Sequence, residues 1–283
     1  MANETGTSLA GEFVLSEVIA QFVYSAPYAG SKIAPLVRQI DIQSVPANTA
    51  EVAKWPTLAA EDLTEAVDMA NTPVNPTSTT VASDEAGLMI ELTDKLLNSD
   101  IHGGPEAYAQ QLLLAVGDKR DADLAAEFAD FSNSVGTSGA NLTETDWLDA
   151  ITTLETGNAV PDFWAAGHPQ QLRDLRVDIV TSSGAVWGTQ APASVVKRMA
   201  SFYDVPFVQS SNCTTANAGA DRLGAMMPMG DHCGISYVLK KRLYVEPQRN
   251  ASKRSTEFVC VEDYGDECTN TAANGGVKIV TDA

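Results

Sequence analysis

The stretch from residue 36 to residue 94 is the most unusual part of this sequence. It opens with LVRQIDI (residues 36–42), in which apolar and polar residues alternate as in a β-strand, and closes with TTV (79–81) and LMIEL (88–92), which also have strand patterns. The residues between these ends are rich in Pro, Thr, Asn, Ala and acidic side chains. Such a long connection with so few apolar residues is rare in a compact domain. We therefore expect a protruding hairpin that has almost no core of its own and must rest on another surface.

Residues 8–25 depend on a partner surface in the same way. Their apolar members follow the spacing of an α-helix: Leu9, Phe13, Val14, Val18, Phe22 and Val23. We expect a short amphipathic helix that ends before Pro27. Because a helix of this length is marginal alone in water, its apolar stripe needs another surface.

The strongest helix pattern covers residues 105–133. Pro105 suits the first turn of a helix, and Gly136 closes the segment. One apolar stripe runs along it, formed by Ala109, Leu112, Leu113, Val116, Leu124, Phe128 and Phe131. The pattern predicts one long helix with a single buried face.

The rest of the chain has a mixed pattern. Thr143 with Asp146 resembles a capping box at the start of one helix. Further helices are expected at 169–175 and 193–203, and strands at 160–164, 205–208, 234–238, 243–246, 256–261 and 276–280. The pattern contains no strand–helix–strand repeat, so it predicts an α+β fold.

The net charge of −19 is distributed unevenly. Up to Val160 there are 24 acidic and 6 basic residues, and from Pro161 onward there are 13 and 12. This balance argues against affinity for DNA phosphates, which requires clustered Lys and Arg. Half of the later basic residues are Lys240, Lys241, Arg242, Arg249, Lys253 and Arg254. They form either a solvated basic stretch or a basic patch that meets the acidic part of another copy, and composition does not choose between the two.

The four cysteines are Cys213, Cys233, Cys260 and Cys268, without a CxxC pair or zinc-like spacing. We expect reduced thiols in a protein made in cytoplasm. A tight turn at Tyr264-Gly265 would place Cys260 opposite Cys268 in a hairpin and permit a disulfide, although two free thiols are the preferred interpretation.

The sequence argues against catalysis and metal binding. A catalytic cysteine needs a base that meets it in space. His232 and Cys233 are adjacent, and adjacent strand residues point to opposite faces. The acidic run at residues 262–267 lacks the pattern of a calcium loop. We expect no catalytic residue, no metal site and no cofactor.

The sequence also lacks membrane signals. No apolar run approaches the roughly 20 residues that span a bilayer. The N-terminus lacks the basic region of a signal peptide. We therefore expect no contact with a membrane.

The order of these segments resembles the Hong Kong 97-type major capsid proteins of tailed bacteriophages. In that order come a helical arm, a proline-spotted hairpin, one long helix, a mixed α/β lobe and antiparallel strands. Local stretches are similar to one branch of the family: MANET (1–5), WP (55–56), AAEDLTE (59–65), AGLMIELTD (86–94), DKRDADL (118–124), YG (264–265) and GVKIVTDA (276–283). Together these stretches extend over essentially the whole chain.

The resemblance implies a division of the chain. Residues 1–35 would be the N-arm, and 36–94 the extended loop (E-loop) hairpin with its base, which lies over a neighbouring subunit. Residues 95–136 with 236–283 would form the peripheral domain, a spine helix at about 105–133 packed on antiparallel strands. Residues 137–235 would form the mixed α/β axial domain.

The resemblance also implies a function. The protein would be structural and not an enzyme, forming homo-pentamers and homo-hexamers of an icosahedral head around double-stranded DNA that it does not read. Further partners would be a separate scaffolding protein, a portal and decoration or cement proteins, with assembly in the host cytoplasm and final location in the virion. The alternatives are an encapsulin-like nanocompartment shell of the same fold and, from another class, an acidic cysteine-dependent hydrolase.

Some members of this family form a covalent cross-link between an E-loop lysine and a peripheral-domain asparagine. Lys54 is the only lysine between residues 33 and 94, and Asn250, Asn270 and Asn274 are possible acceptors. Lys54 is expected near the base of the hairpin and not at its tip, which argues against the cross-link.

Overall fold

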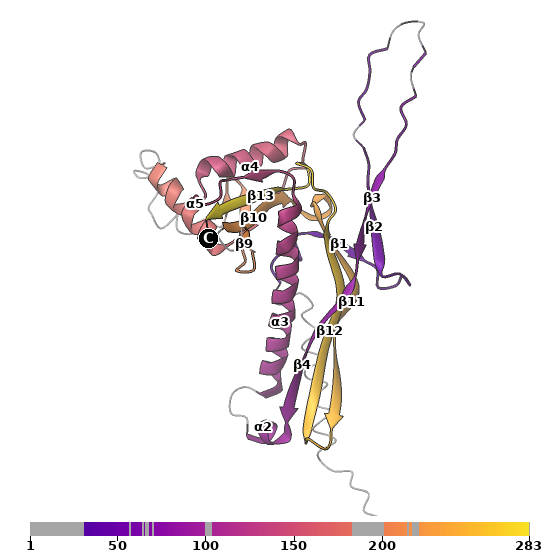
Figure 1. The fold of residues 1–283 in the computed structure, drawn as a ribbon, viewed down its shortest axis with the longest axis vertical. Coiled ribbons are helices and arrows are strands. Elements are labelled where there is room, and N and C mark those ends of the chain that lie inside the picture. The colour runs from indigo at the N-terminus through magenta and orange to yellow at the C-terminus, as the bar shows by residue number, and fades with distance from the viewer. Residues whose placement is uncertain are drawn as a thin grey trace, which may run out of the picture.

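The computed structural model describes residues 31–282, apart from 57, 64, 66–67, 70, 100–103, 183–200, 214 and 217–220. The expected N-terminal helix at 8–25 and most of the expected helix at 193–203 lie outside the described residues. Among the described helices, none is long and apolar enough to cross a membrane. The described chain forms an elongated body with a projecting hairpin (Figure 1).

One end of the body is built on a four-stranded sheet with the order β1-β11-β12-β4. Its strands are β1 (Arg38–Asp41), β11 (Ile235–Asn250), β12 (Ser255–Cys268) and β4 (Asp84–Thr93). The strands β11 and β12 form a long antiparallel pair, β12 pairs antiparallel with β4, and β1 runs parallel to β11. These strands extend side by side down the long axis of the molecule (Figure 1).

The long helix α3 (Gly104–Ala126) lies along this sheet (Figure 1), after the short helix α2 (Asp94–Ser99). Its apolar stripe packs on the sheet, where Leu112, Leu113 and Val116 share a core with Phe258 and Cys260. A 3₁₀ turn, η1 (Glu127–Asp130), continues it. The long helix predicted from the sequence is therefore confirmed, with its last turn tightened.

The other end of the body holds a seven-stranded sheet. Its path is β5 (Ser134–Val135), β13 (Val277–Asp282), β10 (Asp221–Pro228), β6 (Phe163–Gly167), β8 (Val205–Gln209) and β7 (Ser201–Phe202), and β9 (Thr215–Ala216) pairs with β10. The helices α4 (Glu144–Thr156) and α5 (Pro169–Ser182) pack against it.

The core of this lobe is centred on Trp147. Its ring lies 5.9 Å from the rings of both Phe202 and Phe207, and its indole N–H donates to the carbonyl of Phe202 at 3.2 Å. The predicted capping box is present, since Thr143 and Asp146 exchange hydrogen bonds at the start of α4. A second core lies between the lobes and joins them, with Phe131, Trp164 and Tyr237 fully buried.

The projecting hairpin consists of β2 (Thr49–Lys54) and β3 (Thr77–Ala82), joined by residues 55–76. The strand β1, predicted as one arm of this hairpin, instead pairs with β11 in the four-stranded sheet. The hairpin proper is thus shorter than residues 36–94, and β1 and β4 anchor its two ends in the body.

Two further expectations are corrected. The Tyr264-Gly265 pair is not a turn but lies inside β12, because the turn of this hairpin falls at residues 251–254. The strand β13, expected beside the peripheral strands, pairs with β10 and β5 in the seven-stranded sheet. Local strand pattern predicts such elements but not which sheet they join.

Candidate functional site

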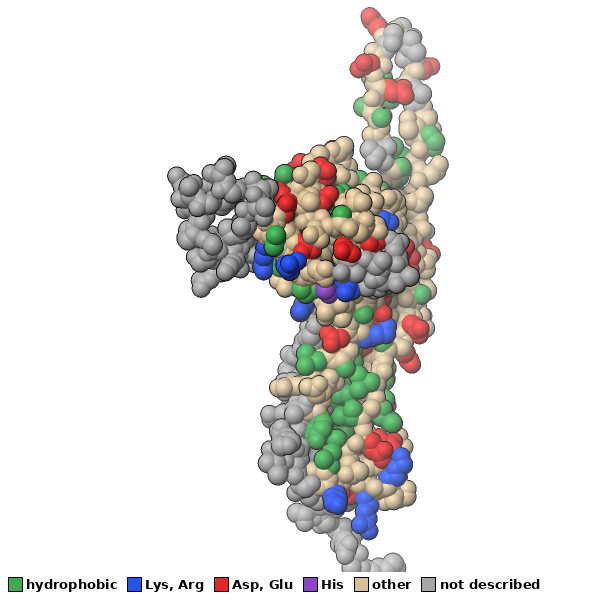
Figure 2. Space-filling model, turned by 60° about the vertical axis from the view of Figure 1, so that its left-hand side comes forward, with side chains coloured by type: hydrophobic (Ala, Val, Ile, Leu, Met, Phe, Trp, Pro, Cys, Tyr) green, Lys and Arg blue, Asp and Glu red, His purple; other side chains and the backbone are tan. Residues whose placement is uncertain are grey.

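The outer part of the hairpin has no core. Between Lys54 and Thr77 every described residue is exposed. The segment carries large apolar side chains in water, namely Trp55, Leu58, Leu63, Met69 and Val74, and the carboxylates Glu61, Asp62, Glu65 and Asp68. Figure 2 shows hydrophobic and acidic side chains along this loop, well clear of the body. Large exposed apolar side chains gathered on one projecting element indicate a contact surface.

The foot of the hairpin is fixed to the body by close packing. Val52 and Val81 are buried in a small cluster with Ile42 and Val238. The end of β3 crosses β12 at Gly265, where a Cβ atom would lie 2.1 Å from the carbonyl oxygen of Ala82. Only glycine fits at that crossing, since real contacts of a Cβ atom are never that short.

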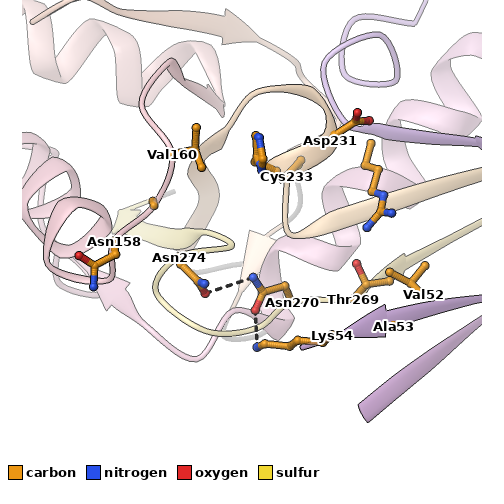
Figure 3. A pocket seen from close by; sticks show the side chains of 13 residues that line it. Val52, Ala53, Lys54, Asn158, Val160, Asp231, Cys233, Thr269, Asn270 and Asn274 are labelled. Carbon is orange, nitrogen blue, oxygen red and sulfur yellow. Dashed lines mark hydrogen bonds between the residues drawn. The ribbon is translucent and has the colours of Figure 1, made fainter. Parts of the chain in front are cut away.

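A pocket lies beside this foot (Figure 3). Its volume is about 200 Å³, and it lies between β2, the loop that follows α4, the 3₁₀ turn η3 (Gly230–His232) and the loop between β12 and β13. Polar groups dominate its wall: Arg38, Lys54, Asn158, Asp231, His232, Thr269, Asn270 and Asn274. Residues far apart in the sequence thus surround one space.

Lys54 lies at the end of β2, where the paired part of the hairpin stops. Its Nζ donates to Oδ1 of Asn270 at 2.6 Å, and Asn270 donates to Asn274 at 3.1 Å (Figure 3). The lysine singled out by the family resemblance therefore contacts one of its three candidate acceptors, within the same chain. Asn250, the third candidate, lies at the far end of β11.

The start of the described chain is held by Asp121 of α3. Its carboxylate accepts hydrogen bonds from the hydroxyl of Ser31 at 2.6 Å and from the backbone N–H groups of Lys32 and Ile33 at 2.8 and 3.1 Å. Asp121 is almost fully buried, so this is a structural anchor for the segment that leads into β1. The helical pattern of residues 105–133 did not predict the burial of Asp121.

The six basic residues expected as one patch divide into two groups along β11. Lys240 donates to the carbonyls of Val45 and Ala47, and Lys241 lies over the ring of Tyr244. At the far end, Arg249 binds Asp94 through two hydrogen bonds of 2.6 and 2.8 Å, and Lys253 lies near Glu91 and Glu257. Arg242 is exposed in mid-strand, and Arg254 lies in the turn.

Much of that charge is thus used inside the chain. A surface for another copy would draw mainly on Arg242 and Arg254, together with the half-exposed pairs at the tip of β11 and β12. The choice between a solvated basic stretch and a basic patch that meets another copy therefore stays open, and the six residues do not form one continuous group along β11.

The four cysteines are buried free thiols. Cys260 and Cys268 lie on the same strand, eight positions apart, so the hairpin disulfide is excluded by geometry. Burial raises the pKa of all four thiols to about 12. A cysteine nucleophile requires the opposite shift, and Cys233 lies against the sulfur of Met227 at 3.2 Å. The cysteine-hydrolase alternative therefore has no support among the described residues.

The interface between α3 and β12 contains a buried ion pair. Arg120 and Glu262 are both nearly inaccessible and form a salt bridge, with the hydroxyl of Tyr237 3.4 Å from the carboxylate. Burial raises the pKa of Glu262, although Arg120 beside it favours the charged form. Glu262 of the acidic run at 262–267 is therefore a buried and paired residue.

The same interface also holds a group of carboxylates. Burial, with Asp123 and Glu127 nearby, raises the pKa of Asp266 to about 7. Burial also raises the pKa of Glu127, which accepts a hydrogen bond from the N–H of Cys268 at 2.8 Å. Asp123 forms a salt bridge with Lys119 at 2.5 Å and accepts a hydrogen bond from the hydroxyl of Tyr264 at 2.6 Å. Within the described part of the chain, no group of His, Cys, Asp and Glu has the geometry to hold a metal ion.

Sequence reasoning missed the pocket and most of its lining. Arg38 and His232 come from segments almost two hundred residues apart, and their proximity depends on the parallel pairing of β1 with β11. One feature of the sequence could have indicated this pocket: Arg38 and Lys54 are two of only six basic residues before Val160.

No protein-family model matches the sequence, and no curated protein matches it. Solved structures do match. A chain in the capsid structure of cyanophage P-SCSP1u has a TM-score of 0.68 and 13% identity, covering 89% of this chain and 88% of that one. The acidic stable capsid structure of Helicobacter pylori bacteriophage KHP30 gives 0.69 and 10%, covering 87% and 88%.

A virus-like particle from Pyrococcus furiosus also matches, with a TM-score of 0.62 and 9% identity, covering 93% of this chain and 98% of that one. Likeness over nearly the whole length, at such low identity, is a likeness of fold. The chain has the Hong Kong 97-type capsid fold.

Proposed function

We propose that this chain is the major capsid protein of a tailed bacteriophage, which assembles into pentamers and hexamers of an icosahedral head around double-stranded DNA. The capsid fold over about nine-tenths of the chain supports this proposal. The acidic chain supports it too, because a container for packed DNA has no use for tight binding of phosphates.

The observation that carries the proposal is the hairpin. Residues 55–76 expose five large apolar side chains and bury none of those described. A monomer gains nothing from holding that surface in water. Copies that lie over one another bury it, as expected for a subunit whose interfaces repeat by symmetry.

In this proposal residues 1–35 are the N-arm and the hairpin is the E-loop. The peripheral domain comprises α3 with the four-stranded sheet, and the axial domain is the lobe with the seven-stranded sheet. The protein is assembled in the host cytoplasm and becomes part of the virion. A scaffolding protein, a portal and decoration proteins are its proposed partners besides its own copies.

Excision of the loop tests this function. Residues 55–76 are replaced by Asn-Gly, which forms a two-residue turn between Lys54 and Thr77, opposed residues at the end of β2 and β3. We expect folded subunits that do not form stable shells, because the lost residues make no described contact with the subunit core. Circular dichroism measures folding, and sedimentation with electron microscopy measures assembly.

The matched control is Val177→Ser, which removes an exposed apolar side chain from α5 and leaves the hairpin intact. This variant is expected to assemble like the wild type. Shells of wild-type stability from the excised protein would show that the hairpin is not an assembly element.

An encapsulin-like shell is the second candidate, and the likeness to the Pyrococcus furiosus virus-like particle favours it. Both candidates predict closed particles, so the contents distinguish them. Double-stranded DNA inside particles from infected cells supports the phage head, whereas a packaged enzyme supports the nanocompartment.

The lysine cross-link, against which the position of Lys54 in the sequence argues, could take two forms, and each has its own test. A bond between copies produces multimers of the 30.0 kDa chain that survive boiling in SDS. A bond from Lys54 to Asn270 within the chain joins Nζ to Cγ and releases ammonia, so the intact mass falls by one ammonia. Monomers of unchanged mass would exclude both forms.

A further inference from the structure

The pocket at the foot of the hairpin concentrates positive charge in an acidic protein. Arg38 and Lys54 both line it, although residues 1–160 hold only 6 basic residues against 24 acidic ones. His232 of η3 lines the same space. Three nitrogen donors from three separate elements therefore surround one cavity of about 200 Å³.

These donors have spare hydrogen-bonding capacity. Neither the guanidinium of Arg38 nor the imidazole of His232 has a hydrogen bond or ion pair with another described residue. Lys54 uses one of its three N–H groups on Asn270, which leaves two. Asn158 and Asn274 add side-chain amides to the wall.

One described carboxylate, Asp231, also lines the pocket. In Figure 3 the side chain of Asp231 is drawn above those of Lys54 and Asn270, and Asp231 forms no hydrogen bond with either residue. The formal charges of Arg38, Lys54 and Asp231 sum to one positive charge. Arg38 and Lys54 together attract an anion more strongly than the single Asp231 carboxylate repels it.

We propose that this pocket binds a small oxyanion, a phosphate or carboxylate group, held by Arg38, Lys54 and His232. The planar guanidinium of Arg38 matches two oxygens of such a group, and Lys54 supplies a point charge. A cavity of about 200 Å³ has room for one such group. A bound oxyanion would link the hairpin, through Lys54, to β1 and η3 of the body.

Two sources of the oxyanion fit this chemistry. One is a free anion such as inorganic phosphate. The other is a carboxylate from the hairpin of a second copy, where Glu61, Asp62, Glu65 and Asp68 are all exposed. The pocket itself belongs to a single chain, so its binding of phosphate does not depend on the proposed capsid function.

Titration of the unassembled subunit with inorganic phosphate tests the site, by calorimetry or phosphorus NMR. We expect saturable binding in the wild type and binding weaker by about tenfold or more in Arg38→Gln and in Lys54→Gln, because each removes a charged donor. Arg254→Gln is the matched control, since it removes an exposed arginine at the far turn between β11 and β12. Its affinity is expected to be unchanged.

Hydrogen–deuterium exchange provides a second measurement that does not rely on affinity. Phosphate is expected to slow exchange in β2 and β3 of the wild type and of Arg254→Gln, and to have no effect in Lys54→Gln. Equal binding by all four proteins, or no binding by the wild type at millimolar phosphate, would overturn the proposal.

A peptide of residues 58–69 identifies the source of the oxyanion. Displacement of phosphate by this peptide assigns the pocket to the hairpin of a second copy. Retention of phosphate in its presence assigns the pocket to a free anion. Either result is consistent with an oxyanion site, and the two results distinguish a free anion from a carboxylate of a second copy.

Discussion

At Gly265 the backbone of β12 lies close against the end of the hairpin strand β3. A Cβ atom there would lie 2.1 Å from the carbonyl oxygen of Ala82. The sequence pair Tyr264-Gly265 suggested a turn, since glycine is common in turns. Glycine is required at position 265 for a different reason, because it lets β3 cross over β12. A sequence shows that a glycine is present but not whether a turn or a crossing strand requires it.

Replacing Gly265 by alanine tests this crossing. We expect Gly265→Ala to lower the free energy of unfolding by about 3 kcal/mol, since the added methyl group pushes backbone against backbone. Gly139→Ala is the control, because its site is open and only its positive φ of 75° opposes alanine, which costs about 1 kcal/mol. Urea unfolding measures both. An equal loss in the two variants would contradict the close crossing.

Because of Asp266, the stability of the folded subunit is expected to fall as the pH rises. Its folded-state pKa is raised from 3.8 to about 7 by burial and by the Asp123 and Glu127 carboxylates. The folded state therefore holds a proton that the unfolded state releases, and stability falls as pH rises from about 4 through 7. Between pH 5 and 8 we expect a loss of about 2 kcal/mol from this group.

Unfolding in guanidinium at pH 5 and pH 8 measures that loss, with Asp266→Asn as the comparison. His168, whose pKa is lowered by burial, acts in the opposite sense below pH 6.5 but is the same in both proteins. Glu91 and Asp94 have lowered pKa values, so their effects fall below pH 5. Identical pH profiles for the wild type and Asp266→Asn would show that Asp266 is not the titrating group.

At the scale of elements, α3 and β12 are joined by apolar packing and by the buried pair of Arg120 and Glu262. The apolar stripe of α3 was predicted correctly, because its period is local. The ion pair was not predictable, since its members are 142 positions apart and the charged run around Arg120 looks like a solvated face.

Breaking this pair is expected to be costly. Glu262→Gln leaves the Arg120 charge buried without its counterion, and we expect a loss of about 3 kcal/mol in the free energy of unfolding. The double variant Arg120→Met with Glu262→Leu replaces both charges by apolar groups and is expected to recover most of that loss. A double variant less stable than the single one would mean that the pair itself stabilises the interface.

For substitutions in the hairpin we expect the opposite result: the stability of the subunit is unchanged and the association between copies is weakened. Leu58 and Leu63 are 56% and 68% exposed, so changing both to serine is expected to leave the subunit's thermal unfolding unaltered. If neighbouring copies bury these side chains, the concentration required for assembly rises at least about tenfold.

Light scattering during assembly measures that concentration, with Val177→Ser as the control on the body. If the double serine variant assembled at the wild-type concentration, the apolar side chains of the hairpin would not belong to the interface between copies. A fall in the subunit's melting temperature would instead show that Leu58 and Leu63 pack in the core of their own subunit.

At the scale of the whole molecule, the α+β class, the long helix and the coreless loop followed from patterns in the sequence. The pairing of β1 with β11 and of β13 with β10 did not, because a strand pattern is the same whichever neighbour it joins. The pocket depends on those pairings, which is why its residues were not predicted as a group. Segments that cannot be stable alone were the most informative part of the sequence.

Electron microscopy of the purified protein, together with its sedimentation, shows whether this chain forms shells from copies of itself. We expect closed particles built from pentamers and hexamers, with a mass much larger than that of the 30.0 kDa chain. A stable monomer or one small discrete oligomer, with no particles at any concentration, would contradict it.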